Sequence, residues 1–197
     1  GAAINQLCAT FKVELDVLPI NIKNPTHDFT QKPAMSENAF IDTINIGLKS
    51  VEKKTDVLCL GEMGIGNTAS AAALCHAVFG SEAELWTGLG TGIDNETYRR
   101  KVELVEKGVR LHQPFINDGL DALIRLGGFE FGAIAGAIVA ARFLQIPVIL
   151  DGFVSSTAAA MLAATQKGSL DHCLVAHMSQ EVGHKKLLFE INKTPLL

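Results

Sequence analysis

The hydrophobic residues of the chain recur with two different periods. Over residues 11–17, apolar side chains alternate with charged ones, which is the two-residue period of a β-strand with one polar face, so we predict an edge strand there. Residues 19–33 are polar, contain three prolines and show no period, which indicates a connecting loop. From Ser36 to Val51, apolar residues return every three or four positions, which predicts an amphipathic helix.

Over the rest of the chain, short apolar runs alternate with longer helical segments. We predict strands at residues 56–60, 84–89, 147–150 and 173–176. Helices are predicted at residues 69–78, from a cap at Asp94, from Gly127-Gly128, and at residues 155–166 and 179–190. This alternation is typical of βαβ units with parallel strands. The predicted fold is a single α/β domain over residues 1–197, with a mostly parallel sheet flanked by helices in a Rossmann-like three-layer architecture.

Composition and charge limit the classes of partner. The chain has 197 residues, of which 48% are hydrophobic and 19% are charged, which favours a packed domain over a disordered chain. The formal net charge is −4 and lysine and arginine do not cluster, so we expect neither nucleic acid nor a membrane as a partner. The most apolar stretch, residues 131–150, is interrupted by polar residues and a proline, which predicts core rather than a membrane span.

The cysteines and histidines favour a cytoplasmic protein without a metal ion. The four cysteines lie far apart and form no CxxC pair, which argues against a zinc site and a disulfide framework. Residues 1–3 have no feature of a secretory signal. His177 and His184 are seven residues apart without a third ligand, so we interpret them as hydrogen-bonded polar residues or as interface residues. Cys75 and His76 are assigned to packing.

A glycine-rich segment, residues 61–68, follows the strand predicted at 56–60. Its three glycines allow the backbone to approach a phosphate, and Glu62 offers an acceptor for a ribose hydroxyl. Asn67 and Thr68 fit a second interpretation equally well, in which they only cap the next helix. The segment matches neither a Walker A loop nor GxGxxG, which argues against a dinucleotide-dependent oxidoreductase.

Two further segments occupy comparable positions. Residues 88–94 resemble a phosphate-binding turn, and Lys101 follows on the next helix, although a lone lysine on a helix is more often a solvated charge. Asp151 directly follows the strand predicted at 147–150. An aspartate there is either a helix cap or a functional carboxylate, and both interpretations stay open.

Six stretches occur in a characteristic order. They are THDF from Thr26 with PAM from Pro33, GEMGIGNTASAAAL from Gly61, GTGID from Gly90 with Lys101, LGGFEFGAIAGA from Leu126, IPVILDGFVSSTAAA from Ile146, and AHMSQEVGHKKLL from Ala176. Together they resemble the nicotinate-nucleotide dimethylbenzimidazole phosphoribosyltransferase family, which acts in assembling the lower nucleotide loop of cobalamin. The resemblance covers almost the whole chain.

The resemblance implies a homodimeric transferase that needs no cofactor. It would move the phosphoribosyl group of nicotinate mononucleotide to 5,6-dimethylbenzimidazole, giving α-ribazole 5'-phosphate and nicotinate. By resemblance, the residues that contact ribose and phosphate are Glu62, Gly64, Gly66, Asn67 and Thr68. Those that bind phosphate are Thr91, Gly92 and Lys101. Asp151 and Ser155 would border the nicotinate or the ribose.

The chain departs from the family pattern at both ends. No Gly-Glu-Gly segment follows Leu188 to supply the glutamate that acts as general base in the family, so the catalytic residue is unassigned. The family's N-terminal portion, which helps to line the benzimidazole pocket, is absent as well. Two hypotheses result. The chain is either the core of a phosphoribosyltransferase or a non-catalytic nucleotide-binding or regulatory relative.

Overall fold

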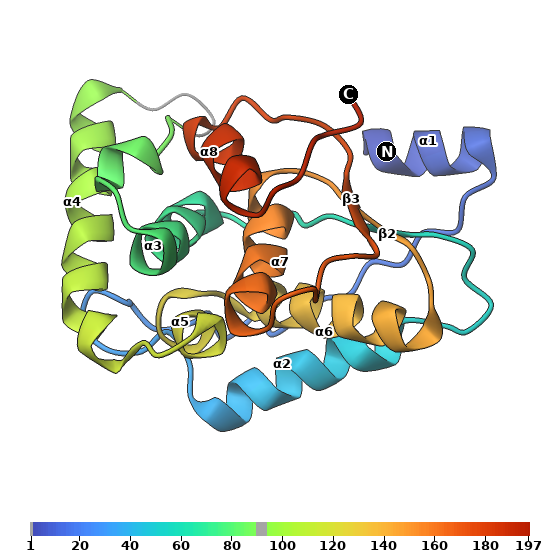
Figure 1. Ribbon diagram of the computed structural model, residues 1–197, viewed down its shortest axis with the longest axis horizontal. Helices are drawn as coiled ribbons and strands as arrows, with labels where there is room; N and C mark the ends of the chain where they lie inside the picture. Colours follow the sequence, from blue (N-terminus) through green and yellow to red (C-terminus); the bar gives the residue numbers. More distant parts are fainter. Residues whose placement is uncertain (1, 90–93) are drawn as a thin grey trace.

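The computed structural model describes residues 2–89 and 94–197 (Figure 1). The elements follow in the order α1 (Ala3–Phe11), α2 (Glu37–Ser50), β1 (Leu58–Leu60), α3 (Asn67–Phe79), η1 (Ala83–Leu85), α4 (Asn95–His112), η2 (Gln113–Phe115), α5 (Gly119–Leu126), α6 (Phe129–Leu144), β2 (Val148–Leu150), α7 (Phe153–Thr165), β3 (Cys173–Val175) and α8 (Val182–Glu190). Most of these elements lie where the apolar periods predict them.

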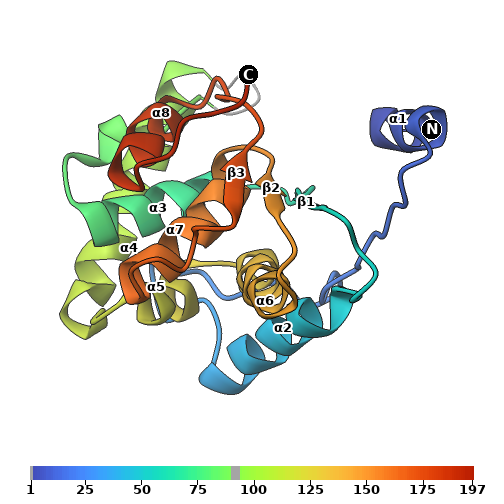
Figure 2. The same cartoon turned by 45° about the vertical axis from the view of Figure 1, so that its right-hand side comes forward.

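The three strands form one parallel sheet in the order β1-β2-β3, flanked by helices (Figures 1 and 2). Leu58 pairs with Val148, and Val148 pairs with Cys173. Parallel neighbours need a crossover connection, which α7 provides between β2 and β3. The predicted α/β fold class with a parallel sheet is therefore confirmed.

The strand predicted at residues 11–17 is wrong. Helix α1 ends at Phe11, Lys12 takes a left-handed conformation with φ of 56°, and residues 13–20 have no strand assignment. No residue of α1 is buried, and Figure 2 draws this helix apart from the body of the molecule. Alternating residues form a strand only where a neighbouring strand supplies hydrogen bonds. No strand of the described sheet pairs with residues 13–20.

The strand predicted at residues 84–89 is also wrong. The segment begins with the short 3-10 helix η1, and the indole N–H of Trp86 donates to the carbonyl of Gly80 over 2.7 Å. The Thr87 hydroxyl donates to the carbonyl of Ala83 over 2.8 Å. Because Trp86 and Thr87 are both buried, these bonds hold a compact turn in place of a strand.

Small residues let the helices of the core approach closely. A Cβ added to Gly136 on α6 would overlap the Ile44 carbonyl of α2, and one added to Gly47 on α2 would overlap the Ala133 carbonyl of α6. Residues 153–162 of α7 are all buried. The predicted core at residues 131–150 is confirmed by the burial of most of α6 and of β2.

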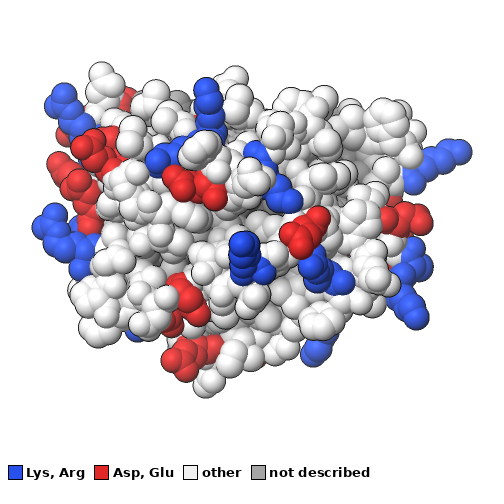
Figure 3. Space-filling view, in the orientation of Figure 1, with Lys and Arg blue, Asp and Glu red and all other residues white. Residues whose placement is uncertain are grey.

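The face drawn in Figure 3 carries no patch of clustered basic side chains. The lysine and arginine side chains on this face are scattered among acidic ones. No helix among the described residues has both the length and the apolar character needed to cross a lipid bilayer.

Candidate functional site

The three parallel strands point the same way, so the loops after them lie at one edge of the sheet (Figure 1). The backbone N–H of Asp151 donates to the carbonyl of Leu60 over 3.0 Å, and that of Ala176 donates to the carbonyl of Leu150 over 2.8 Å. The three loops therefore leave the sheet side by side. Ligands of open α/β sheets bind at this edge.

The loop after β1 is organised around the carboxylate of Glu62. Its Oε2 accepts the backbone N–H of Gly64 over 2.6 Å and the side-chain amide of Asn67. A Cβ added to Gly64 would overlap that amide, so the close approach requires glycine there. Oε1 of Glu62 has no hydrogen-bond partner among the described residues. This oxygen can accept a hydroxyl of a sugar.

Helix α3 starts at this loop with free backbone donors. Gly66 is the N-cap and has φ of 80°, in the left-handed region that favours glycine. No side chain caps the helix, so the interpretation of Asn67 and Thr68 as caps is wrong. The backbone N–H groups of both residues have no acceptor within the described part of the chain. Free N–H groups at a helix N-terminus attract anions.

Lys101 of α4 extends to the first turn of α3. Its ammonium donates to the Thr68 hydroxyl and to the Gly88 carbonyl, each over 2.9 Å. Burial lowers the pKa of Lys101, whereas the nearby charge of Glu181 raises it. Lys101 is thus a half-buried cation beside a helix N-terminus, and the interpretation as a solvated charge is wrong.

Glu181, in the turn before α8, lies beside Lys101 and Gly88. A Cβ added to Gly88 would overlap its Oε2, so the carboxylate lies directly against the Gly88 backbone. That Oε2 is buried and has no hydrogen-bond partner among the described residues. Gly88, the first residue of the predicted 88–94 turn, therefore lies against the turn that precedes α8. Thr91 and Gly92 lie outside the described residues.

Asp151 and Ser155 differ in how they face this edge. The carboxylate of Asp151 is exposed and lies 3.8 Å from Nδ1 of His177, within ion-pair distance when His177 is protonated. The cap of α7 is Gly152, so the interpretation of Asp151 as a cap is wrong. Ser155 is buried, and its hydroxyl exchanges hydrogen bonds with the backbone of Gly152. The structure does not bring the Ser155 hydroxyl to the surface of the site.

His184 and Cys75 have structural surroundings, whereas His177 is partly exposed beside Asp151. His184 is fully buried and hydrogen-bonded to Ser179 and Ser156, as expected for a satisfied core histidine. Cys75 is also fully buried, as its assignment to packing predicts. Among the described residues, no group of three or more histidine, cysteine or acidic side chains is arranged to hold a metal ion.

Sequence reasoning missed two residues of the site, Glu130 and Glu181. Oε1 of Glu130 accepts the side-chain amide of Asn67 over 3.2 Å. Burial raises the pKa of Glu130, and the charge of Glu62 raises it further. Both glutamates lie in stretches that carry the family resemblance, the LGGFEFGAIAGA and AHMSQEVGHKKLL segments. That membership is the signal that could have found them.

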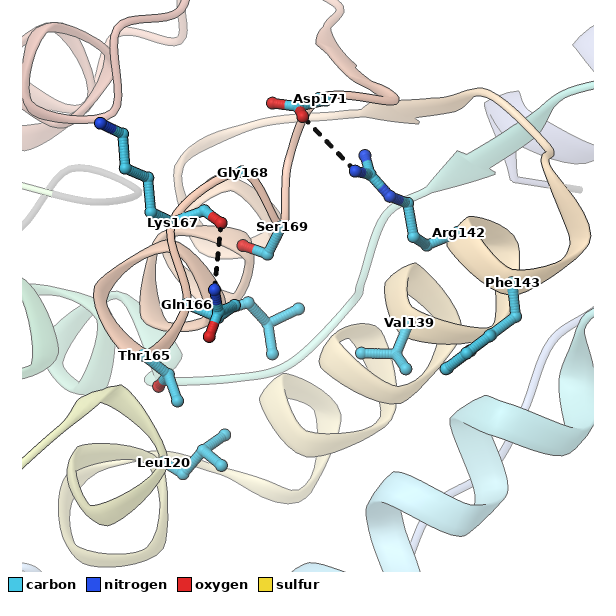
Figure 4. A pocket seen from close by; sticks show the side chains of 11 residues that line it. Leu120, Val139, Arg142, Phe143, Thr165, Gln166, Lys167, Gly168, Ser169 and Asp171 are labelled. Carbon is cyan, nitrogen blue, oxygen red and sulfur yellow. Dashed lines mark hydrogen bonds and ion pairs between the residues drawn. The ribbon is translucent and has the colours of Figure 1, made fainter.

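A separate hollow of about 440 Å³ lies elsewhere on the molecule (Figure 4). Leu120, Val139 and Phe143 line it, and an ion pair of 3.4 Å between Arg142 and Asp171 closes one side. The ends of α6 and α7 border this hollow, and they lead into the amino ends of β2 and β3. It therefore lies at the opposite edge from the three loops.

Comparison with known proteins identifies the family. A family model described as "Phosphoribosyltransferase" matches residues 1–197. The chain belongs to this phosphoribosyltransferase family. Two curated relatives, from Rhizobium rhizogenes and Brucella anthropi, are named nicotinate-nucleotide–dimethylbenzimidazole phosphoribosyltransferase. They are 48% and 50% identical to this chain over all its 197 residues, and the chain spans 58% of the length of each.

Solved structures of family members have the same fold. The crystal structure of CobT from Thermus thermophilus matches with a TM-score of 0.86 at 30% identity, over all of this chain and 65% of that one. A second structure from the same organism, named as a nicotinate-nucleotide–dimethylbenzimidazole phosphoribosyltransferase, matches with a TM-score of 0.83 at 29% identity, over all of this chain and 64% of that one. The described chain therefore has the fold of these phosphoribosyltransferases.

Proposed function

We propose that this chain is the nucleotide-binding part of an enzyme that transfers phosphoribose from nicotinate mononucleotide to 5,6-dimethylbenzimidazole, which yields α-ribazole 5'-phosphate and nicotinate for the nucleotide loop of cobalamin. The names of the curated relatives support this reaction. The observation that carries the proposal is the position of the Lys101 ammonium, hydrogen-bonded to Thr68 at the free N-terminus of α3. A cation and free N–H groups together suit a phosphate.

The residues divide between the phosphate and the sugar. We assign the phosphate to Lys101, to the first turn of α3 and to Thr91 and Gly92. The loop at Gly64 and Gly66 would border the phosphate, and Oε1 of Glu62 would accept a ribose hydroxyl. The exposed carboxylate of Asp151 would border the ribose or nicotinate end of the nucleotide, and the buried Ser155 would support that border through its hydrogen bonds with the Gly152 backbone. No cofactor takes part.

The proposed reaction exchanges one N-glycosidic bond for another. The bond between the anomeric carbon and the cationic pyridinium breaks, and its electron pair leaves with the ring as nicotinate. A nitrogen of the benzimidazole attacks the same carbon from the opposite face, which inverts the configuration. The other benzimidazole N–H then loses its proton to a general base. No residue of this chain is assigned as that base.

Nucleotide binding tests the proposal most directly. Titration calorimetry would measure the Kd of nicotinate mononucleotide for the unchanged chain, for Lys101→Met and for Lys107→Met, an exposed lysine of the same helix. A charge-assisted bond to phosphate contributes about 1.5–3 kcal/mol, so Lys101→Met should bind about 10- to 100-fold more weakly. The control should bind as the unchanged chain does. No binding by the unchanged chain, or equal effects of both variants, would refute the assignment.

A second measurement separates the two hypotheses for the family member. Chromatography of the full-length protein mixed with nicotinate mononucleotide and 5,6-dimethylbenzimidazole would detect nicotinate and the ribotide. Product formation by the full-length protein supports the transferase. Tight nucleotide binding by the full-length protein without product supports a non-catalytic nucleotide-binding relative.

We also propose a homodimer that works in the cytoplasm. The support for a dimer is the exposed apolar surface on and after α1, where Phe11 is 71% and Val17 is 74% exposed. Light scattering would give the mass in solution, and a monomer at all concentrations tested would contradict the dimer.

A further inference from the structure

We propose that Glu130 is a positioning residue, which acts through the side-chain amide of Asn67 to hold the Glu62 carboxylate in place for the ribose of the nucleotide. The inference rests on the proposed function, because it concerns the same nucleotide site. Three elements meet at this point: Glu62 lies in the loop after β1, Asn67 begins α3, and Glu130 lies in the first turn of α6.

The amide of Asn67 is shared between the two carboxylates. Its Nδ2 donates to Oε2 of Glu62 and, over 3.2 Å, to Oε1 of Glu130. An amide nitrogen has two hydrogens, so each carboxylate receives one of them. With both hydrogens used, the amide cannot rotate without losing a bond. Since Asn67 is 8% exposed, water cannot readily replace the bond to Glu130.

The backbone at the start of α6 is shaped to direct Glu130 toward this amide. A Cβ added to Gly128, the N-cap of α6, would lie 2.5 Å from Oε2 of Glu130. The side chain of Glu130 therefore folds back over Gly128, and a larger residue there would displace it. The backbone N–H of Glu130, at the positive end of the helix dipole, acts to lower the pKa of its carboxylate and so opposes part of the rise caused by burial.

Glu130 is not an obvious source of stability. Burial is the main cause that raises its pKa, and the neighbouring Glu62 charge adds to the rise. A raised pKa means that the folded state disfavours the ionised carboxylate, which costs stability at neutral pH. An uncharged side chain would fill this half-buried position without that cost. The role that requires an acceptor at this position is orientation of the Asn67 amide.

The test compares two substitutions of Glu130 with a matched control. Glu130→Met fills a similar space and removes the acceptor, whereas Glu130→Gln keeps an acceptor oxygen for Asn67. Glu37→Gln removes a carboxylate from the first turn of α2, on the exposed surface. Titration with nicotinate mononucleotide should show about tenfold weaker binding for Glu130→Met, less than about threefold for Glu130→Gln, and no change for the control.

Two readouts distinguish positioning from a structural role. The melting temperature of Glu130→Met should shift little, because loss of the buried hydrogen bond to Asn67 and removal of a disfavoured charge oppose each other, and a fall large enough to unfold the variant during the titration would overturn the proposal. In an Asn67→Ala background, Glu130→Met should cause no further loss of binding, because its effect passes through that amide. Additive losses, or a Glu130→Met that binds like the control, would also overturn it.

A ligand-free measurement keeps this inference separate from the proposed function. If the unchanged chain does not bind the nucleotide, the proposed function fails. The positioning can still be measured by NMR of the Glu62 carboxyl carbon and the Asn67 side-chain amide. Both signals should shift in Glu130→Met and much less in Glu130→Gln. An unmoved Glu62 signal in Glu130→Met would overturn the inference.

Discussion

Acidification should destabilise the fold through His184. This ring is fully buried between α7 and α8. The backbone N–H of Ser179 donates to its Nδ1 over 3.0 Å, so Nδ1 must be unprotonated, and Nε2 carries the hydrogen toward the Ser156 hydroxyl at 3.1 Å. A second proton, placed on Nδ1, would point at the Ser179 N–H instead of at an acceptor, so this arrangement disfavours the protonated ring. Burial, with a smaller contribution from His177, lowers the pKa of His184 from 6.5 to about 4.

The size of the effect follows from proton linkage. The folded state binds the proton less readily than the unfolded state, so the stabilisation is complete above pH 6.5 and is lost as the pH falls toward 4. Each pH step of one costs about 1.4 kcal/mol in this window. At pH 5 the unfolded histidine is protonated and the folded one is neutral. The expected loss of unfolding free energy relative to pH 7.5 is therefore about 2 kcal/mol.

Urea unfolding at the two pH values measures this loss. His184→Gln removes the titrating ring, so its unfolding free energy should fall by about 2 kcal/mol less between pH 7.5 and pH 5 than that of the unchanged chain. His112 and His172, whose pKa values are also lowered by burial, titrate in both proteins and cancel in the comparison. His27→Gln, at an exposed position, is the control and should keep the full pH dependence. The same dependence in His184→Gln as in the unchanged chain would refute the reasoning.

Two further predictions concern packing. Gly136→Ala should lower the unfolding free energy in urea by about 1–3 kcal/mol, because its methyl group meets the Ile44 carbonyl of α2, and a loss below about 0.5 kcal/mol would contradict the close crossing. In the folded chain at pH 8, a thiol reagent should label the exposed Cys59 and should not label Cys75, because burial raises the pKa of Cys75 to about 12. In the unfolded chain the reagent should label both. Labelling of Cys75 in the folded chain as early as Cys59 would argue against its burial.

Local signals explain which elements the sequence predicts well. Asp94 caps its helix as expected, because a cap needs only the backbone N–H three residues later, and Ser36 caps α2 in the same way. Residues 11–17 mislead for the opposite reason. Their alternation is local, but a strand also needs a partner that no local pattern specifies. The turn around Trp86 likewise depends on burial of the indole, a property of the assembled core.

The candidate site divides in the same way. Glu62 and Lys101 can be found from the sequence, since one follows a predicted strand in a glycine-rich loop and the other follows a predicted turn. Glu130 lies 63 residues from Asn67, and only the folded chain brings the two together. The family resemblance includes both residues, because it rests on several segments that lie far apart in the sequence. It does not show which side chains of those segments contact one another, and the structure does.

The first turn of α3 joins the two halves of the site. Asn67 donates to the carboxylates of Glu62 and Glu130, whereas the next residue, Thr68, accepts from the ammonium of Lys101. Adjacent residues of one helix turn thus hold acidic groups on one side and a cation on the other. In the proposed function the acidic side takes ribose hydroxyls and the cationic side takes the phosphate. Because a single rigid turn carries both contacts, it fixes the distance between the two groups and so favours a 5'-phosphorylated ribose over either group alone.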